Sequence, residues 1–247
     1  MTARRRWGGA VPMALALVTA TPTVAGPPYL TDDPVPTDPG RWEIYAFGSG
    51  ARASGRTDGE AGLDLNYGAA PDLQLTLVAP VGFKRGDGRH TGRGDVELAA
   101  KYRFAHQAPN GRGLDMAVFP AVTLPTGDRQ FGERRPTLEL PIWAQKEIGP
   151  WSMFGGGGYR LRPGDGRRDV WSVGVAVTRA VGERLSVGGE VHHETAEEAG
   201  AGTSTVLALG AAWRASGHWS LLVSGGPDLR SRERDGASLY LSLKADY

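Results

Sequence analysis

Leu239-Tyr-Leu-Ser-Leu-Lys-Ala-Asp-Tyr247 closes the sequence, and it alternates strictly between apolar and polar residues up to the last position. A period of two predicts a β-strand with one apolar face. A soluble protein seldom ends on such a strand, because chain ends usually fray. An outer-membrane β-barrel must pair its last strand with its first, and its outer surface contacts lipid. The ending therefore favours a membrane barrel. The apolar face carries Leu239, Leu241, Leu243, Ala245 and Tyr247.

The same alternation recurs along the chain in about twelve segments, most of them close to the roughly ten residues that a tilted membrane strand needs. In the segment 72–84, for example, Leu73, Leu75 and Leu77 share one face, while Gln74 and Thr76 share the other. The expected strands are 41–50, 62–70, 72–84, 95–104, 113–125, 137–149, 151–162, 169–180, 183–194, 203–215, 218–226 and 236–247.

The connections between these strands alternate between short and long. In an outer-membrane barrel, short turns face the periplasm and long loops face outward. The long connections follow odd-numbered strands, so the pattern predicts an all-β, single antiparallel transmembrane barrel of about twelve strands with both termini in the periplasm. The segment 105–112 is longer than this rule expects. Short connections lie at 70–72, 149–150, 181–183 and 216–217, and long ones at 51–61, 85–93, 126–136, 163–168, 195–202 and 227–235.

Two local features refine the expected strands. Proline removes a backbone donor from the sheet, so Pro80, Pro120 and Pro141 predict bulges or strand ends near a barrel rim. For the strand 41–50, the sequence leaves open which of its two faces is the apolar one.

An interfacial belt of aromatic residues accounts for the tryptophans near strand ends or on apolar faces. These are Trp42, Trp143, Trp151, Trp171, Trp213 and Trp219.

The amino terminus has the pattern of a secretory signal peptide. Arg4, Arg5 and Arg6 precede a short apolar stretch at 10–20, and small residues end at Ala25. We expect residues 1–25 to be removed after export. Without the three signal arginines, 25 basic residues stand against 27 acidic ones, which leaves no footprint for nucleic acid.

Residue composition excludes several other kinds of site. The sequence has no cysteine, so it forms no disulfide, thiolate metal site or cysteine nucleophile. No apolar run after residue 25 reaches the roughly 18 residues that a transmembrane helix needs. We therefore expect residues 41–247 to form one barrel domain with no cofactor and no metal.

Residues 26–40 form a Pro- and Asp-rich extended segment, which we call the leader. Pro34, Pro36 and Pro39 exclude a helix. The leader is interpreted as a stiff periplasmic arm before the first strand. Two alternatives stay open: a plug inside the barrel, and a calcium site at Asp32 and Asp33, for which no spaced ligand loop is present.

Charged residues collect on the faces opposite the apolar ones. They predict either a lumen lining that selects a polar or amphipathic solute, or a set of ion pairs that fills a narrow barrel. The candidate lumen-lining residues are Asp64, Asp95, Glu97, Lys101, Arg103, Asp115, Glu139, Arg160, Arg162, Arg184, Glu190, His192 and Arg214.

Catalysis has weak support. His192 and His193 are the best candidates for an outer-membrane hydrolase, but Ser186 on the face of His192 lies about 20 Å away along the strand. We expect rim histidines and no enzyme. The glycines at 155–158 lack the following helix and lysine of a phosphate loop.

Three stretches resemble a bacterial outer-membrane family named for the meta-cleavage pathway of phenol degradation, whose members are usually labelled transporters. They are 29–45, 62–75 and 94–104. The resemblance implies a barrel and a transport role, and it supplies no catalytic or ligand residues.

We therefore expect passive or facilitated passage of small solutes, aromatic or amphipathic ones among them, through a charge-lined lumen in the outer membrane. A structural barrel with a packed lumen is the alternative. The expected partners are outer-membrane lipid and the barrel-assembly machinery, which reads an aromatic carboxy-terminal strand.

Overall fold

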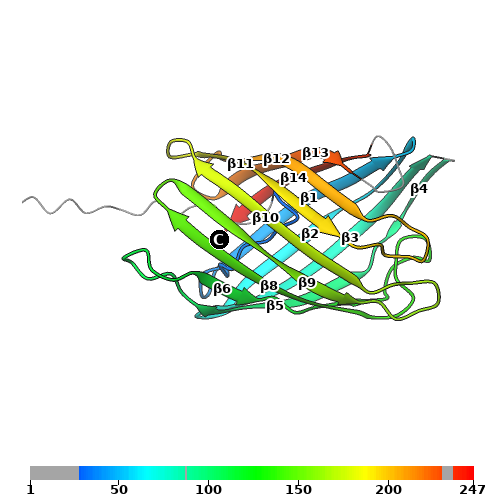
Figure 1. Cartoon of the computed structure of the whole chain (residues 1–247), viewed down its shortest axis with the longest axis horizontal. Helices are drawn as coiled ribbons and strands as arrows, with labels where there is room; N and C mark the ends of the chain where they lie inside the picture. Colours follow the sequence, from blue (N-terminus) through cyan, green and yellow to red (C-terminus); the bar gives the residue numbers. More distant parts are fainter. Residues whose placement is uncertain (1–27, 87, 230–235) are drawn as a thin grey trace, which may run out of the picture.

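A computed structural model describes residues 28–86, 88–229 and 236–247; the expected signal peptide lies outside them. The described chain is a tilted antiparallel barrel (Figure 1). The strands are β1 (Trp42–Ala53), β2 (Arg56–Ala70), β3 (Leu73–Gly86), β4 (Gly88–Arg93), β5 (Val96–Ala105), β6 (Asp115–Val118), β7 (Ala121–Leu124), β8 (Thr137–Ile148), β9 (Trp151–Leu161), β10 (Val170–Ala180), β11 (Leu185–Glu194), β12 (Ser204–Arg214), β13 (Trp219–Asp228) and β14 (Gly236–Asp246).

The barrel closes where the last strand meets the first. β14 pairs with β1 from Ala237–Arg52 to Asp246–Glu43. At the end of this seam, Trp42 and Tyr247 exchange backbone hydrogen bonds of 2.9 and 3.0 Å. We call this end of the barrel the terminal end and the opposite end the loop end. Closure removes the sheet edge that β14 would otherwise expose.

Fourteen strand elements make twelve wall positions in the described chain, because two positions are interrupted. β4 and β5 both pair with β3, and β6 and β7 both pair with β5 and β8. The prediction of an all-β antiparallel barrel of about twelve strands is therefore confirmed. No helix among the described residues is long and apolar enough to cross a membrane.

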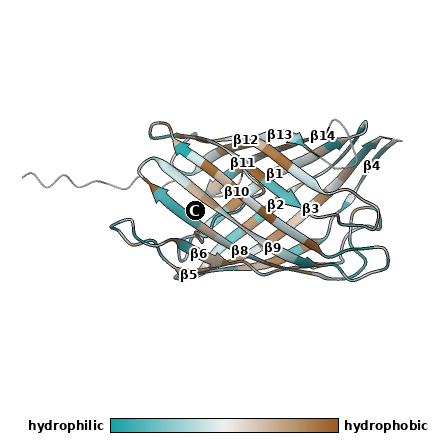
Figure 2. Ribbon diagram, viewed as in Figure 1, coloured by the Kyte–Doolittle hydropathy of each residue, from teal (hydrophilic) through white to brown (hydrophobic). Residues whose placement is uncertain are grey.

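Alternation along each strand separates an apolar outer face from a mainly polar inner face. On β12, Leu209 is 78% exposed, whereas the neighbouring Ala208 is 4% exposed and faces inward. Apolar colour accordingly alternates with paler and hydrophilic colour along the strands in Figure 2. The outer face includes four residues of the final segment, Leu239, Leu241, Leu243 and Tyr247, all exposed. Ala245 is buried beside its strand neighbours Trp219 and Ile44.

Two expectations about the wall were wrong. Pro80 and Pro141 lie within β3 and β8 and not at strand ends, whereas Pro120 does interrupt the wall, between β6 and β7. Their carbonyls still accept hydrogen bonds from Gly94, Phe119 and Ala100, which limits the disruption. Trp143 is 5% exposed and faces inward, so it is not part of an interfacial belt.

The connection expected at 51–61 was also wrong, because β1 and β2 continue through it. Ser54 and Gly55 have φ angles of 50° and 77°, which make the tight turn of a two-residue hairpin. The structure also fixes the phase of β1: Tyr45 is buried and packs inside the barrel with Ala212 and Leu222.

Candidate functional site: an occupied lumen

The described part of the leader, residues 28–40, lies inside the barrel. It appears in dark blue behind the strands in Figure 1, and Thr31, Asp33 and Thr37 are each 3% exposed or less. The leader enters at the terminal end, where Gly40 donates a 2.7 Å hydrogen bond to the carbonyl of Gly68. Its far end reaches β13, where the hydroxyl of Ser224 donates to the carbonyl of Pro28. This is the arrangement of a plug and not of an arm outside the barrel.

A carboxylate from β11 holds the far half of the leader. Glu190 Oε1 and Oε2 accept hydrogen bonds from the backbone N–H groups of Leu30 and Thr31 at 3.0 and 2.9 Å. The Thr31 hydroxyl lies 3.5 Å from His192 Nδ1 on the same strand. Hydrogen bonds to an ionised group are stronger than neutral ones, so Glu190 is the main anchor of this half.

A row of uncharged polar side chains holds the near half. Gln74 Oε1 accepts from both the backbone N–H and the hydroxyl of Thr37, at 2.8 and 3.0 Å. Gln74 Nε2 donates to Asn66 Oδ1 at 2.7 Å, and Thr76 donates to the same oxygen at 2.6 Å. Asn66 in turn donates to Asp64 at 2.8 Å, so the row is fully connected from leader to wall.

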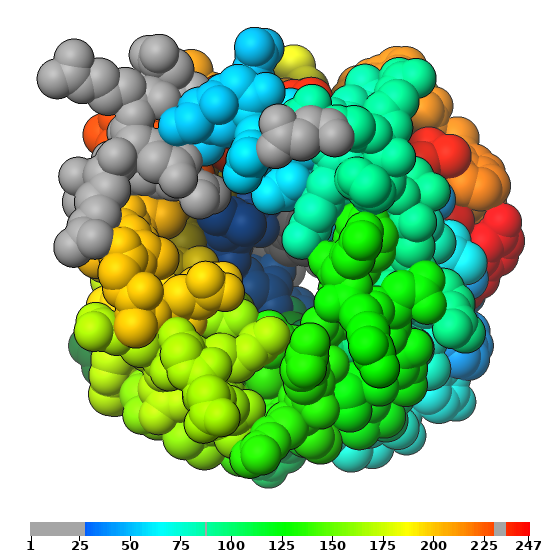
Figure 3. All heavy atoms as spheres, turned by 90° about the vertical axis from the view of Figure 1, so that its right-hand side faces the viewer, coloured from blue at the N-terminus to red at the C-terminus, as the bar shows by residue number. Residues whose placement is uncertain are grey.

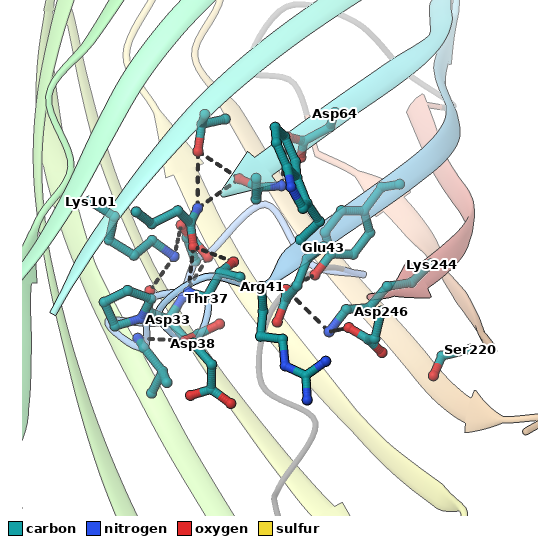
Figure 4. A pocket seen from close by; sticks show the side chains of 18 of the residues that line it. Asp33, Thr37, Asp38, Arg41, Glu43, Asp64, Lys101, Ser220, Lys244 and Asp246 are labelled. Atoms are coloured by element: carbon teal, nitrogen blue, oxygen red, sulfur yellow. Dashed lines mark hydrogen bonds and ion pairs between the residues drawn. The ribbon is translucent and has the colours of Figure 1, made fainter. Parts of the chain in front are cut away.

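Lys101 of β5 binds the acidic part of the leader (Figure 4). Its ammonium lies 2.8 Å from Asp32 Oδ2, donates a 2.8 Å hydrogen bond to the carbonyl of Asp33, and lies 4.8 Å from the ring centre of Phe119. Burial raises the pKa of Asp33 to about 7, although Lys101 opposes the rise. A calcium ion at Asp32 would have to displace this ammonium, and no group of three or more possible metal ligands occurs among the described residues.

Between the leader and the wall lies a cavity of about 820 Å³, close to the terminal end (Figure 4). Lys244 Nζ lies 3.1 Å from Glu43 and 3.0 Å from Asp246, which makes a charged cluster on its wall. The cavity brings together four of the predicted lumen-lining residues: Asp64, Glu97, Lys101 and Arg214.

Shared arginines organise the loop end of the lumen. Arg160 lies 2.9 Å from Glu139, 3.7 Å from Glu194 and 3.5 Å from Glu197. Arg162 lies 2.7 Å from Glu133, a residue of the loop after β7. Glu133 also forms an ion pair with Arg167. We call this set, with Asp95, the mouth network.

Asp95 fixes the loop that carries Glu133. Its two carboxylate oxygens accept backbone hydrogen bonds from Gly127 and Glu133 at 2.7 and 2.5 Å. Asp95 was predicted to line the lumen from a strand, but it lies in the interruption between β4 and β5. Figure 3 views the molecule from this end and shows a hollow with dark blue atoms of the leader inside it.

The remaining candidates divide into three groups. Glu190 and His192 contact the leader, as described above. Arg103 pairs with Asp72 at 2.9 Å and with Asp115 at 3.5 Å near the terminal end. Arg184 is exposed in the turn before β11, so it does not line the lumen as predicted. The prediction extended the alternation of Ser186 back to Arg184. Arg184 lies before the strand begins, and a turn does not preserve the direction of side chains.

The hydrolase alternative gains no support from the histidines. His192 Nε2 lies 3.7 Å from Glu194, and its other nitrogen faces the leader. His193 Nδ1 lies 2.8 Å from the hydroxyl of Thr205. Ser186 donates a 3.4 Å hydrogen bond to the carbonyl of Arg179 and not to a histidine.

Sequence reasoning missed the uncharged members of the site. Asn66, Gln74 and Thr76 are polar positions in alternating strands, but an uncharged side chain on such a face gives no signal that distinguishes a binding role from simple solvation. Glu133 was assigned to a loop, and nothing local indicated that it bonds to Arg162. The position of Tyr29 inside the lumen had no sequence signal.

Solved structures share this fold. A COG4313 outer membrane channel from Pseudomonas putida F1 is 18% identical, with a TM-score of 0.70 over 86% of this chain and 97% of that chain. The NanC porin is 8% identical, with a TM-score of 0.58 over 82% and 98%. The KdgM porin is 8% identical, with a TM-score of 0.57 over 82% and 99%. At these identities the likeness concerns the fold. No curated protein sequence matches the chain.

A family model described as "Putative MetA-pathway of phenol degradation" matches residues 54–242, from the first hairpin to the last strand. The leader lies outside the matched range. Because the match covers more than half of the sequence, the chain belongs to this family.

Proposed function

We propose that this protein is an outer-membrane channel for small solutes and that the leader closes it reversibly. The observation that carries the proposal is the leader inside the lumen, which side chains of the wall hold beyond the β-bridge from Pro39 to Gly68. Such contacts exchange with water without breaking the barrel, because every wall strand keeps its own partners. The resemblance in fold to a channel and two porins supports the same function.

The solute path follows from the two polar regions. A solute enters the hollow at the loop end, passes the arginines and carboxylates of the mouth network, and reaches the cavity at the terminal end when the leader moves. Rings of fixed charge favour solutes with polar groups and slow purely apolar ones. No step requires a cofactor or a covalent intermediate.

The deciding experiment compares conductance in planar bilayers. One sample is the purified mature protein. The other lacks residues 26–40; it is expressed with residues 1–25 joined directly to residue 41 and is purified after export. Both are inserted into the bilayer under the same conditions. We expect rare openings from the former and a stable open channel from the latter. A shortened barrel that is folded but does not conduct would refute the channel and favour a structural barrel, which the paired charges of the mouth network also suit.

Orientation and targeting belong to the proposal. The terminal end faces the periplasm, the apolar outer face contacts lipid, and cleavage follows Ala25. A cysteine placed at Arg129 in the loop after β7 should react with an impermeant maleimide on intact cells, and the mass of the mature protein reports the cleavage site. Replacing Tyr247 with alanine should reduce the amount of assembled barrel if the assembly machinery reads the final strand.

A further inference from the structure

One aromatic ring of the leader occupies a pocket in the inner wall of the barrel. The ring of Tyr29 is 8% exposed and packs against Phe154 of β9 and Ala176 of β10, which are 2% and 0% exposed. The ring centres of Tyr29 and Phe154 are 6.2 Å apart and inclined by 54°. This tilted contact is a favourable geometry for two aromatic rings.

The wall is shaped to admit the ring. A Cβ atom added to Gly210 of β12 would lie 2.9 Å from both Cε1 and the phenol oxygen of Tyr29, closer than ordinary packing allows. A Cβ at Gly174 of β10 would lie in the same way against Thr31. The absence of side chains at these two inward positions leaves the space that the leader fills, so the pocket belongs to the wall.

A hydrogen-bond acceptor adjoins this pocket. Glu190 lies on β11, between β10 and β12, and its carboxylate accepts two N–H groups from the residues that directly follow Tyr29. An aromatic slot beside a carboxylate suits a neutral ring that carries an O–H or N–H donor. It disfavours an aromatic carboxylate, because two like charges would be brought together in a partly desolvated site.

We propose that this pocket is the binding site for a small neutral aromatic solute with a hydrogen-bond donor, and that Tyr29 occupies it as a tethered mimic of that solute. The proposal deepens the proposed function, since a lumen that solutes enter is its premise. A solute that binds displaces the ring, frees the leader, and thereby favours the open channel.

Tethering determines how strong the competition is. A short linker gives a local concentration on the order of millimolar, so a solute must compete with a permanently available ring. Removing the ring should therefore raise the apparent affinity for the solute. Filling the pocket from the wall should abolish binding whether or not the ring is present.

The test uses 4-fluorophenol as the probe and fluorine NMR on the purified mature barrel. We expect Tyr29→Ala to bind the probe at least tenfold more tightly than the unsubstituted protein, and Tyr29→Phe to resemble the unsubstituted protein. Adding Gly210→Val to Tyr29→Ala should remove binding. The control for a valine in a wall strand is Gly48→Val on the outer face of β1, because a Cβ at Gly48 meets no atom closer than 4.0 Å.

Two further results bear on the chemistry. 4-Fluorobenzoate should bind Tyr29→Ala at least tenfold more weakly than 4-fluorophenol, and Glu190→Gln should narrow that difference. Equal binding of 4-fluorophenol to Tyr29→Ala with and without Gly210→Val would overturn the proposal. So would equal affinity of Tyr29→Ala and the unsubstituted protein.

Binding and conduction are measured separately, so the two proposals can fail independently. A channel that conducts after removal of residues 26–40 but never binds the probe would leave the function standing and refute the pocket. A barrel that binds the probe but does not conduct after this removal would refute the channel and leave the pocket standing. If Gly210→Val does not fold, as judged by heat-dependent migration on gels, Phe154→Ala on Tyr29→Ala serves instead and should weaken binding at least tenfold.

Discussion

The two ends of the lumen are narrowed by different means. At the terminal end, the leader is a separate segment that binds the wall through backbone N–H groups, one aromatic ring and the ammonium of Lys101. At the loop end, the contacts of Arg160 and Arg162 join wall residues and the loops that connect neighbouring strands. A segment joined to the wall at β1 can leave the lumen as a unit, whereas the width of the mouth changes only if the wall and its loops rearrange. The difference assigns reversible closure to the leader and a fixed constriction to the mouth.

The largest effect should come from the main anchor of the leader. Glu190→Ala removes the acceptor of two backbone donors, and a hydrogen bond to a charged group is worth roughly 1.5–3 kcal/mol. Losing two such bonds should shift the equilibrium between closed and open channel about a hundredfold or more toward open, as measured by open probability in planar bilayers. Glu60→Ala on β2 is the control, and an equal shift there would show that any lost carboxylate acts this way.

A smaller effect is expected at Gln74, the neutral anchor of the near half. Gln74→Leu removes the acceptor used by the N–H and hydroxyl of Thr37. A neutral hydrogen bond contributes about 1 kcal/mol, so losing two should raise the ratio of open to closed channel roughly thirtyfold. In the double variant with Glu190→Ala, the open probability should rise little above that of Glu190→Ala alone, because the leader is already free. If the two effects on open probability add in full, the leader does not move as a single segment.

Breaking the mouth should change selectivity and leave closure in place. Arg160→Ala leaves Glu139, Glu194 and Glu197 without their shared arginine. Reversal potentials across a KCl gradient should move toward cation selectivity, and the free energy of unfolding should fall by roughly 1 kcal/mol, because these pairs are partly exposed to water. A rise in open probability as large as that of Glu190→Ala would erase the distinction between the two ends.

The smallest effect should be a pH dependence of leader docking. Burial raises the pKa of Asp33 from its usual 3.8 to about 7 in the docked leader. A pKa that is higher when docked means that protonation favours docking. Docking should therefore be strongest near pH 4, weaken as pH rises toward 7, and level off above it. Asp33→Asn should flatten the open probability between pH 5 and 8, and an unchanged slope in this variant would assign the effect elsewhere.

The sequence by itself determined the barrel, because the information is local. Period-two alternation places Leu239 and Leu241 on a lipid face and Ser242 and Lys244 on an inner face, and short turns set the order of the strands. The same rule identified Lys101 and Glu190 as inward, and it failed at Arg184, which lies past the end of a strand. Trp143 shares the inward face of β8 with Glu139, so alternation places it correctly and only its assignment to an interfacial belt was wrong.

Only the tertiary structure decided what fills the lumen. A proline-rich leader has no periodicity that distinguishes the inside of a barrel from the outside, and its contacts join residues up to 196 positions apart, as between Pro28 and Ser224. The partners of Arg160 and Arg162 likewise depend on how strands and loops meet around a closed ring. Local alternation decides which face of a strand a residue lies on. Which residues meet across the lumen depends on how the barrel closes, so the filling of the pore by the leader is a property of the assembled barrel.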